Sequence, residues 1–381
     1  MTTRFAHGLV IGKFYPPHLG HDHLISTAAR QCGRVTVLVM AASDESIPGG
    51  DRARWLTSAH AQEQNVHVLS VPSDAPVDYT DDIVWTAQVA LMRAAASQVS
   101  DVPVDVVFSS ELYGEELAAR LDAQHVLVDP ERSQVPVSST MLRANLASNW
   151  HLLTPAARAG LALRVVLVGA ESTGTTTIAE LLTARYRAQG GIWSRTRCVA
   201  EYGREYTEVK WAHAIAEARK VGRNEPSLDE LIWTSDEFDD IAVEQTRREE
   251  AAAVDGSPLL ICDTDAFATS IWERRYLGEA VRHEQAWATH GLPRRDVYLL
   301  TSHDGVPWLD DGLREGDLEV RASMTDWFAN ALTRAGHSWV LLTGDVDQRV
   351  QIAATVIDRL MRARLSFAAS ITENSTAPTR S

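Results

Sequence analysis

Short apolar runs rich in β-branched residues recur along the whole chain, with helix-length segments between them. Five of these runs occupy residues 8–11, 35–39, 66–71, 104–108 and 125–128, and five more occupy residues 164–168, 198–200, 259–262, 297–300 and 339–342. A run that is apolar at nearly every position predicts a strand buried on both faces, which is typical of parallel sheets covered by helices. Two such series in 381 residues predict two α/β domains, each built on a doubly wound parallel sheet.

The segment between the two series indicates where the domains join. Pro155 stands where a short helix would begin, because proline is favoured in the first helical turn. We therefore expect a first domain over residues 1–147, a helical connector over 148–163 and a second domain over 164–367. Residues 368–381 are polar, rich in Ser and Thr and without a hydrophobic period, so we expect a disordered tail.

The composition argues against several classes of function. With 36 Lys and Arg against 51 Asp and Glu, the formal net charge is −15, so the chain lacks the basic character that DNA binding requires. Cys32, Cys198 and Cys262 are far apart and without CxxC spacing, which disfavours a disulfide framework or a zinc knuckle. The first residues lack a signal-peptide pattern, and no apolar run approaches the ~18 residues of a membrane span. We expect a cytoplasmic protein that binds neither DNA nor membranes.

The first strand leads directly into a turn with two glycines, GKFYPPHLGH at residues 12–21, and then into a helical pattern. A helix N-terminus at the carboxyl end of a first strand presents unpaired N–H groups and the positive end of the helix dipole, which favour a phosphate. His18 and His21 would lie on one side of this helix, where both side chains can donate to phosphate oxygens. Taken alone, this pattern also fits surface histidines, or a metal site that includes His23.

A second motif, SSTMLR at residues 138–143, places three hydroxyl side chains at another helix start. Hydroxyl and N–H groups there can bind one phosphate while Arg143 folds back over another; the alternative is a simple helix cap with a solvated arginine. Together the two motifs resemble the GxFxPxHxGH and SSTxxR signatures of the nucleotidylyltransferase superfamily. The order of the motifs, and their separation by four further strands, also resemble the Rossmann-like domain of that superfamily.

Residues 52–56, 107–114 and 129–132 extend this resemblance to the nicotinamide mononucleotide (NMN) adenylyltransferase domain of bifunctional NAD-biosynthesis proteins. The resemblance implies that NMN and ATP react to give NAD and pyrophosphate. A phosphate oxygen of NMN would attack the α-phosphorus of ATP without a covalent enzyme intermediate. The protein would then contribute positioning and charge stabilisation.

The resemblance also implies roles for individual residues of the first domain. Those implied in ATP binding are Gly12, Lys13, Phe14, His18, Gly20, His21, Ser138, Ser139, Thr140 and Arg143. His18, His21 and Arg143 are the implied catalytic residues, and Mg²⁺ would screen the leaving pyrophosphate. Trp55 and Trp85 are candidates for stacking on the nicotinamide ring, although both also fit a hydrophobic core.

The second series opens with a strand, the loop GAESTGTTT at residues 169–177, and a helix. This is the GxxxxG and hydroxyl pair of a P-loop, whose backbone N–H groups cradle phosphate while Thr176 meets Mg²⁺. The residues predicted to bind ATP are Gly169, Ala170, Glu171, Ser172, Thr173, Gly174, Thr175, Thr176 and Thr177. Thr175 replaces the usual lysine, which removes a point charge from the β- and γ-phosphates. The loop therefore predicts nucleotide binding more strongly than it predicts catalysis.

Residues 200–205, 263–265 and 306–314 are similar to segments of the ribosylnicotinamide kinase domain of the same bifunctional family. That resemblance implies transfer of the γ-phosphate of ATP to the 5′-hydroxyl of nicotinamide riboside, making the NMN that the first domain uses. Asp263 follows a strand, where its carboxylate would hold Mg²⁺ or accept the hydroxyl proton.

Four charged residues of the second domain are candidate contacts for the riboside or for phosphate: Glu201, Arg204, Asp265 and Arg314. One hypothesis is that Arg314 or Arg204 partly replaces the missing lysine. For each of the four, a solvated surface position is an equally simple interpretation.

Three functions fit the sequence. The first is an enzyme with both activities, which uses ATP, NMN, nicotinamide riboside and NAD. The second is an adenylyltransferase whose P-loop domain is a weak kinase or a nucleotide sensor, because Thr175 replaces lysine. The third is a regulator that senses NAD or ATP without turnover. The sequence decides neither between NMN and nicotinate mononucleotide nor whether the chain forms a homo-oligomer.

Some members of the bifunctional family carry an N-terminal helix-turn-helix repressor module. Here the adenylyltransferase motif begins at Gly12, so we expect no such module and no DNA-binding repression.

Overall fold

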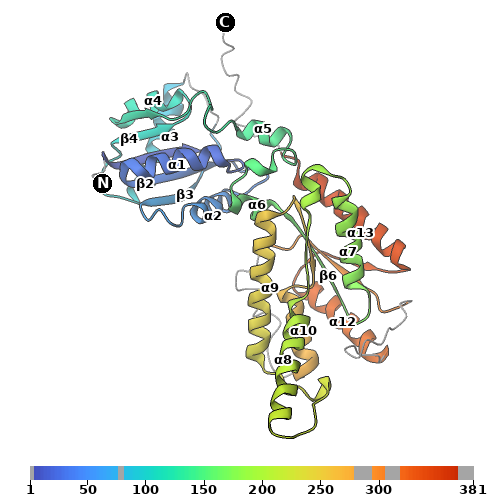
Figure 1. Ribbon diagram of the computed structural model, residues 1–381. Helices are drawn as coiled ribbons and strands as arrows, with labels where there is room; N and C mark the ends of the chain where they lie inside the picture. The colour runs from blue at the N-terminus through green and yellow to red at the C-terminus, as the bar shows by residue number, and fades with distance from the viewer. Residues whose placement is uncertain (1–3, 76–80, 279–293, 305–317, 368–381) are drawn as a thin grey trace. The chain divides into compact units, whose positions relative to one another are not determined.

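The computed structural model describes residues 4–75, 81–278, 294–304 and 318–367. The chain forms two compact units, one of residues 1–160 with 365–381 and the other of residues 161–364 (Figure 1). The first unit thus includes Phe367, whose ring packs edge-to-face on Tyr15 with the centroids 5.5 Å apart.

The first unit is built on a parallel five-stranded sheet in the order β3-β2-β1-β4-β5. Its strands are β1 (Phe5–Gly12), β2 (Cys32–Ala41), β3 (Val66–Pro72), β4 (Val106–Ser109) and β5 (Gln124–Leu127). Its helices are α1 (Leu19–Gln31), α2 (Gly49–Ala59), α3 (Asp82–Ser97), α4 (Tyr113–Leu121), α5 (Ser139–Ala144), the 3₁₀ turn η1 (Trp150–Leu152) and α6 (Pro155–Leu161), which leads into the second unit.

Both faces of this sheet are buried, as the unbroken apolar runs predict. Val10 of β1 belongs to a core that includes Ile25 of α1 and Leu56 of α2. The next residue back, Leu9, faces the opposite side and belongs to a core with Trp85 of α3 and other residues of α3 and α4. Because β1 lies between β2 and β4, the direction of winding reverses beside it, and the crevice at its carboxyl end is where such sheets bind ligands.

The second unit is a parallel five-stranded sheet in the order β10-β9-β6-β8-β7. Its strands are β6 (Leu163–Gly169), β7 (Arg197–Val199), β8 (Leu259–Asp263), β9 (Val297–Thr301) and β10 (Trp339–Leu342). Its described helices are α7 (Thr175–Arg187), η2 (Gly191–Arg195), α8 (Tyr202–Lys220), η3 (Leu228–Glu230), α9 (Ser235–Asp255), α10 (Ala266–Leu277), α12 (Leu318–Arg334) and α13 (Val346–Arg364).

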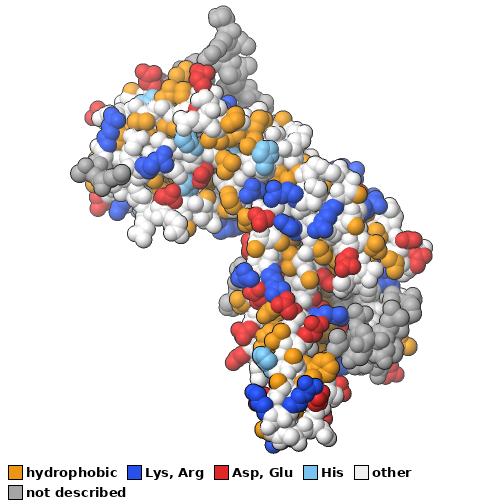
Figure 2. All heavy atoms as spheres, viewed as in Figure 1, with side chains coloured by type: hydrophobic (Ala, Val, Ile, Leu, Met, Phe, Trp, Pro, Cys, Tyr) orange, Lys and Arg blue, Asp and Glu red, His pale blue; other side chains and the backbone are white. Residues whose placement is uncertain are grey.

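The predicted fold class is confirmed, because each of the ten predicted runs overlaps a strand of one of two parallel α/β sheets. No helix within the described ranges is long and apolar enough to span a membrane. On the face drawn in Figure 2, acidic and basic side chains are interspersed over the second unit. The ion pairs of the second unit include Lys220 with Glu217 and Arg219 with Glu225 at the end of α8.

Candidate functional sites

The turn after β1 brings His18 and His21 together at the start of α1. His18 is the N-cap residue of the helix, and its Nδ1 accepts a hydrogen bond from the backbone N–H of His21 at 3.4 Å. The two imidazole rings stack with their centroids 3.6 Å apart. Gly20 permits this packing, because a Cβ there would lie only 3.1 Å from the His18 ring. Nδ1 of His21 is buried and has no hydrogen-bond partner within the described residues.

Both histidines are neutral in this environment. Burial, followed by the positive charge of Arg132, lowers the pKa of His18 to about 3. Burial, with His18 and Arg132 as further causes, also lowers the pKa of His21. Each neutral ring offers one N–H donor, and binding of an anion would raise both pKa values.

Two arginines hold the backbone of the motif on either side of Phe14, which has the positive φ of 49°. Arg143 donates from Nη1 to the carbonyl oxygen of Tyr15 at 2.8 Å, and Arg52 donates from Nη1 to the carbonyl oxygen of Lys13 at 2.7 Å. The fully buried Arg52 also pairs with Glu45, which is equally buried, at 2.7 Å. Sequence reasoning missed both contacts of Arg52, because no local pattern pairs it with Glu45 and because 39 residues separate it from Lys13.

A cavity of about 670 Å³ opens at this end of the sheet. All ten residues that the resemblance implies in ATP binding line it: Gly12, Lys13, Phe14, His18, Gly20, His21, Ser138, Ser139, Thr140 and Arg143. The side chain of Ser138 caps α5 by accepting the N–H of Met141 at 3.1 Å, so this second motif also presents a helix N-terminus.

Of the two tryptophans proposed to stack on the nicotinamide ring, only Trp85 lies at the cavity. Trp85 of α3 lines the cavity, with the Arg120 guanidinium 5.3 Å from its ring centroid. Trp55 is not among the described residues that line the cavity. It packs instead against α6, where a Cβ on Gly160 would come within 2.2 Å of its indole ring.

The loop between β6 and α7 has the backbone that a phosphate cradle requires. Ser172 and Gly174 both adopt the left-handed conformation, with φ values of 57° and 88°. Gly169 is required by packing, because a Cβ there would lie 2.0 Å from Oγ1 of Thr301. The N–H groups at the start of α7 are therefore left open to a ligand in the manner of a P-loop.

Thr175 and Thr176 both direct their hydroxyls to Asp263 at the end of β8. Thr176 Oγ1 donates to Asp263 Oδ2 at 2.6 Å. Burial raises the pKa of Asp263, and the hydrogen bonds from Thr176 and Thr175 only partly oppose this rise. The residue at the lysine position thus faces a carboxylate and adds no positive charge to the loop.

A smaller cavity of about 170 Å³ lies beside this loop. Eight of the nine predicted loop residues line it, all but Thr173, and Glu201 and Arg204 of the sequence prediction line it too. Its far side is aromatic: the ring of Trp233 lies 5.4 Å from Phe238 and 5.4 Å from Tyr276, measured between centroids. No local pattern in the sequence identifies these three residues as neighbours.

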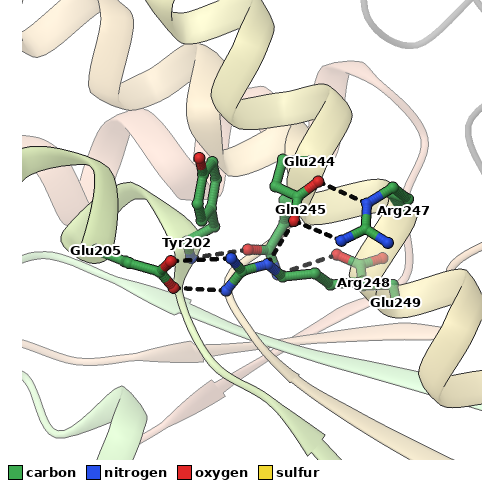
Figure 3. A network of polar contacts seen from close by, with 7 residues as sticks. All are labelled: Tyr202, Glu205, Glu244, Gln245, Arg247, Arg248 and Glu249. Carbon is green, nitrogen blue, oxygen red and sulfur yellow. Dashed lines mark hydrogen bonds and ion pairs between the residues drawn. The ribbon is translucent and has the colours of Figure 1, made fainter. Parts of the chain in front are cut away.

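A polar network fixes the start of α8 against α9 (Figure 3). Glu201 is the N-cap of α8, and Arg204 lies in its first turn. The backbone N–H of Tyr202 donates to Oε1 of Gln245 at 2.9 Å, and Arg248 binds both carboxylate oxygens of Glu205. Gln245 is buried and lines the cavity, so it belongs both to the network and to the wall of the site.

Two residues that the sequence predicted to contact the riboside or phosphate, Asp265 and Arg314, are not found at the cavity among the described residues. Asp265 is fully buried and is the N-cap of α10. Its carboxylate accepts hydrogen bonds from Ala268 N, Arg295 Nε and Tyr298 OH at 2.8 to 3.0 Å, so it is not available to a ligand, contrary to the expectation. Arg314 lies outside the described residues.

Each unit therefore has a parallel sheet with a cavity beside helix N-termini, and the class of protein is a two-domain α/β protein with two candidate phosphate sites. Residues 9–145 match the cytidylyltransferase-like family, and residues 164–349 match an AAA domain. Two curated relatives are both named trifunctional NAD biosynthesis/regulator protein NadR. The protein of Salmonella typhimurium is 24% identical over 319 residues, and that of Escherichia coli is 24% identical over 324 residues. Each alignment covers 81% of this chain and 71% of the relative.

Two solved structures have the same arrangement of elements. NadR protein in complex with NR superposes with a TM-score of 0.60 at 20% identity, and NadR in complex with NAD and AMP-PNP superposes with a TM-score of 0.56 at 19% identity. Both cover 94% of this chain and 97% of the other. The chain is therefore similar to the NadR proteins over most of its length, with a region that matches the cytidylyltransferase-like family followed by a region that matches an AAA domain, in agreement with the resemblance that the motifs indicated.

Proposed function

We propose that the chain is an enzyme of NAD synthesis with two activities. The first unit transfers the adenylyl group of ATP to NMN, which gives NAD and pyrophosphate. The second unit transfers the γ-phosphate of ATP to nicotinamide riboside, which gives NMN. The observation that carries the proposal is that His18, His21, Ser139 and Arg143, from two motifs far apart in the sequence, line one cavity at two helix N-termini.

In the first unit, catalysis is positioning and charge stabilisation. The N-termini of α1 and α5 and the N–H donors of the neutral His18 and His21 bind the triphosphate of ATP. Arg143, held by the carbonyl oxygen of Tyr15, supplies a fixed positive charge for the negative charge that develops on the leaving pyrophosphate. Trp85 gives the nicotinamide ring an aromatic surface within the same cavity.

In the second unit, the loop cradles the phosphates of ATP and the aromatic side of the cavity receives the nicotinamide ring of the riboside. The hydroxyl of Thr176 and the carboxylate of Asp263 fit Mg²⁺, since this ion takes one or two protein oxygens and fills its shell with phosphate and water. Mg²⁺ bound there would neutralise charge on the phosphates. Arg204 lines the cavity and lowers the pKa of Asp263 through its positive charge.

One observation favours a second candidate function for this unit, a nucleotide sensor with little turnover. Thr175 replaces the P-loop lysine and hydrogen-bonds to Asp263, so the loop itself supplies no cation. The adenylyltransferase does not depend on this difference.

The test is to incubate the purified chain with ATP and Mg²⁺ and to follow NAD and NMN separately by chromatography. NMN as acceptor should give NAD, and nicotinamide riboside should give NMN and then NAD. NAD from NMN without any product from the riboside would leave the adenylyltransferase and favour the sensor. No product from either acceptor would refute the proposal, and a faster reaction with nicotinate mononucleotide would reassign the acceptor.

A matched pair of measurements assigns the two reactions. Arg143→Ala should lower NAD formation from NMN by about 100-fold, because it removes a charge-assisted contact to the phosphates. The same variant should leave NMN formation from the riboside unchanged.

We place these reactions in the cytoplasm, a proposal supported by the three cysteines, which are all unpaired.

A further inference from the structure

Arg321 of α12 lies against the phosphate loop of the second unit. Its side chain is fully buried, and Nη2 donates to the carbonyl oxygen of Ser172 at 3.3 Å. This contact joins residues 149 positions apart in the sequence. The turn that it touches carries the left-handed Ser172 and leads directly into the N-terminus of α7.

The other donors of Arg321 are unused. Nε and Nη1 are buried and have no hydrogen-bond partner within the described parts of the chain, and no carboxylate pairs with the guanidinium there. Burial lowers the pKa of Arg321. The hydroxyl of Ser172 is also buried without a partner among the described residues. Buried donors without partners are costly, so this cluster calls for an anion.

Arg349 of α13 shows that burial beside the loop does not by itself leave an arginine without partners. It is also buried, and its Nη1 donates to the carbonyl oxygens of Thr173 and Ser302 at 3.1 and 2.9 Å. Its Nε and Nη2 donate to the carbonyl oxygens of Gly344 and Asp304. All three nitrogens of Arg349 are used by the fold, whereas only Nη2 of Arg321 has a partner among the described residues.

We propose that Arg321 replaces the missing P-loop lysine, and that its Nε and Nη1 donate to the terminal phosphates of ATP bound at the loop. This inference rests on the kinase activity proposed above. In that reaction the 5′-oxygen of the riboside forms a bond to the γ-phosphorus and releases its proton to water. The bond from the γ-phosphorus to the bridging oxygen breaks, and its electron pair stays on ADP. Arg321 would stabilise the charge that gathers there.

Arg204 is the competing cation, and the two differ in their surroundings. Arg204 is exposed and acts on Asp263, whereas Arg321 is buried and contacts the loop. A desolvated charge interacts more strongly with phosphate than an exposed one, because the effective dielectric is lower. We therefore assign the main part of the lost lysine's role to Arg321.

The test compares Arg321→Met, Thr175→Lys and the double variant in the intact chain. Arg321→Met should lower kcat for NMN formation from the riboside by about 100-fold. Adding Thr175→Lys to it should restore at least about tenfold, because a lysine at that position reaches the same phosphates. Arg334→Met, at the other end of α12, removes an exposed charge from the same helix and should leave kcat unchanged. NAD formation from NMN, measured on every variant, reports on the first unit.

The outcomes separate the two proposals. A wild-type chain that makes no NMN from the riboside refutes the proposed kinase and this inference with it. An active wild type whose activity survives Arg321→Met, or falls only in Arg204→Met, refutes the role of Arg321 alone. So does a double variant that melts like the wild type but gains nothing from the Thr175→Lys change. If Arg321→Met does not fold, Arg321→Gln is measured instead, because it removes the charge and keeps a polar side chain. A folded Arg321→Gln chain with full kinase activity would overturn the assignment.

Discussion

His18 and His21 stack with their ring centroids 3.6 Å apart, and neither ring is protonated in the folded chain at neutral pH, because burial lowers the pKa of each. One of them caps α1 while the other keeps a buried nitrogen without a partner among the described residues. The site therefore holds two closely packed N–H donors that a bound triphosphate can use. The same burial disfavours the protonated form of each imidazole.

This arrangement predicts that the first unit loses stability as the solution becomes acidic. The pKa of His18 falls from 6.5 to about 3, so between these values the unfolded chain binds a proton that the folded chain does not. Stability should decrease as the pH falls from 6.5 towards 3. Thermal unfolding at a series of pH values measures this, and His18→Asn should weaken the dependence by about one proton. The same slope in both proteins would contradict the assignment.

The buried pair of Arg52 and Glu45 predicts a large effect on stability. Arg52→Met removes the closer of two charge partners of the buried Glu45 carboxylate and leaves Lys13, whose Nζ lies 3.4 Å from Oε1. It should lower the free energy of unfolding of the first unit by up to about 3–5 kcal/mol. The double variant Arg52→Met with Glu45→Gln removes both charges and should recover part of the loss. Urea denaturation measures both values. A double variant no more stable than the single one would indicate that Arg52 acts through the Lys13 carbonyl instead.

Asp263→Asn should reduce the kinase reaction specifically. The amide keeps the shape and can still accept a hydrogen bond from Thr176, but it removes the negative charge that suits Mg²⁺. We expect NMN formation from the riboside to fall by about 100-fold or more, with a higher Mg²⁺ concentration needed for half-maximal rate. Steady-state rates over a Mg²⁺ series test this. Undiminished activity at every Mg²⁺ concentration would remove Asp263 from the reaction.

The two tryptophans of the first unit provide a matched comparison. Trp85→Leu removes the aromatic surface from the cavity and should raise KM for NMN by about tenfold, with a smaller effect on KM for ATP. Trp55→Leu should leave both KM values unchanged, because Trp55 packs against α6. Initial rates over a range of NMN concentrations distinguish them. Equal KM values for Trp85→Leu and the wild type would place the nicotinamide ring elsewhere.

Much of the fold is visible in local sequence patterns. The unbroken apolar runs at 8–11 and 164–168 become β1 and β6, because a strand buried on both faces needs apolar side chains at successive positions. Motifs that join a strand to a helix N-terminus are also local, so the sequence predicts the ten residues implied in ATP binding, all of which line the first cavity.

These local patterns do not predict which side chains become buried against residues far away in the sequence. Asp265 and Asp263 look alike in the sequence, two residues apart after one strand. In the folded chain, Asp265 is buried and accepts a hydrogen bond from Arg295, whereas Asp263 accepts one from Thr176 beside the phosphate loop. Trp55 and Trp85 likewise differ only in what packs against them.

The two α/β domains, the two candidate phosphate turns and the threonine at the lysine position can all be read from local sequence, because each depends on residues close together in the chain. Which charges surround those turns depends on the tertiary fold. Arg52 reaches Lys13 across 39 residues and Arg321 reaches Ser172 across 149, and both are stripped of water by the folded chain around them. Such a charge acts strongly because it is desolvated, and desolvation is a property of the folded chain alone.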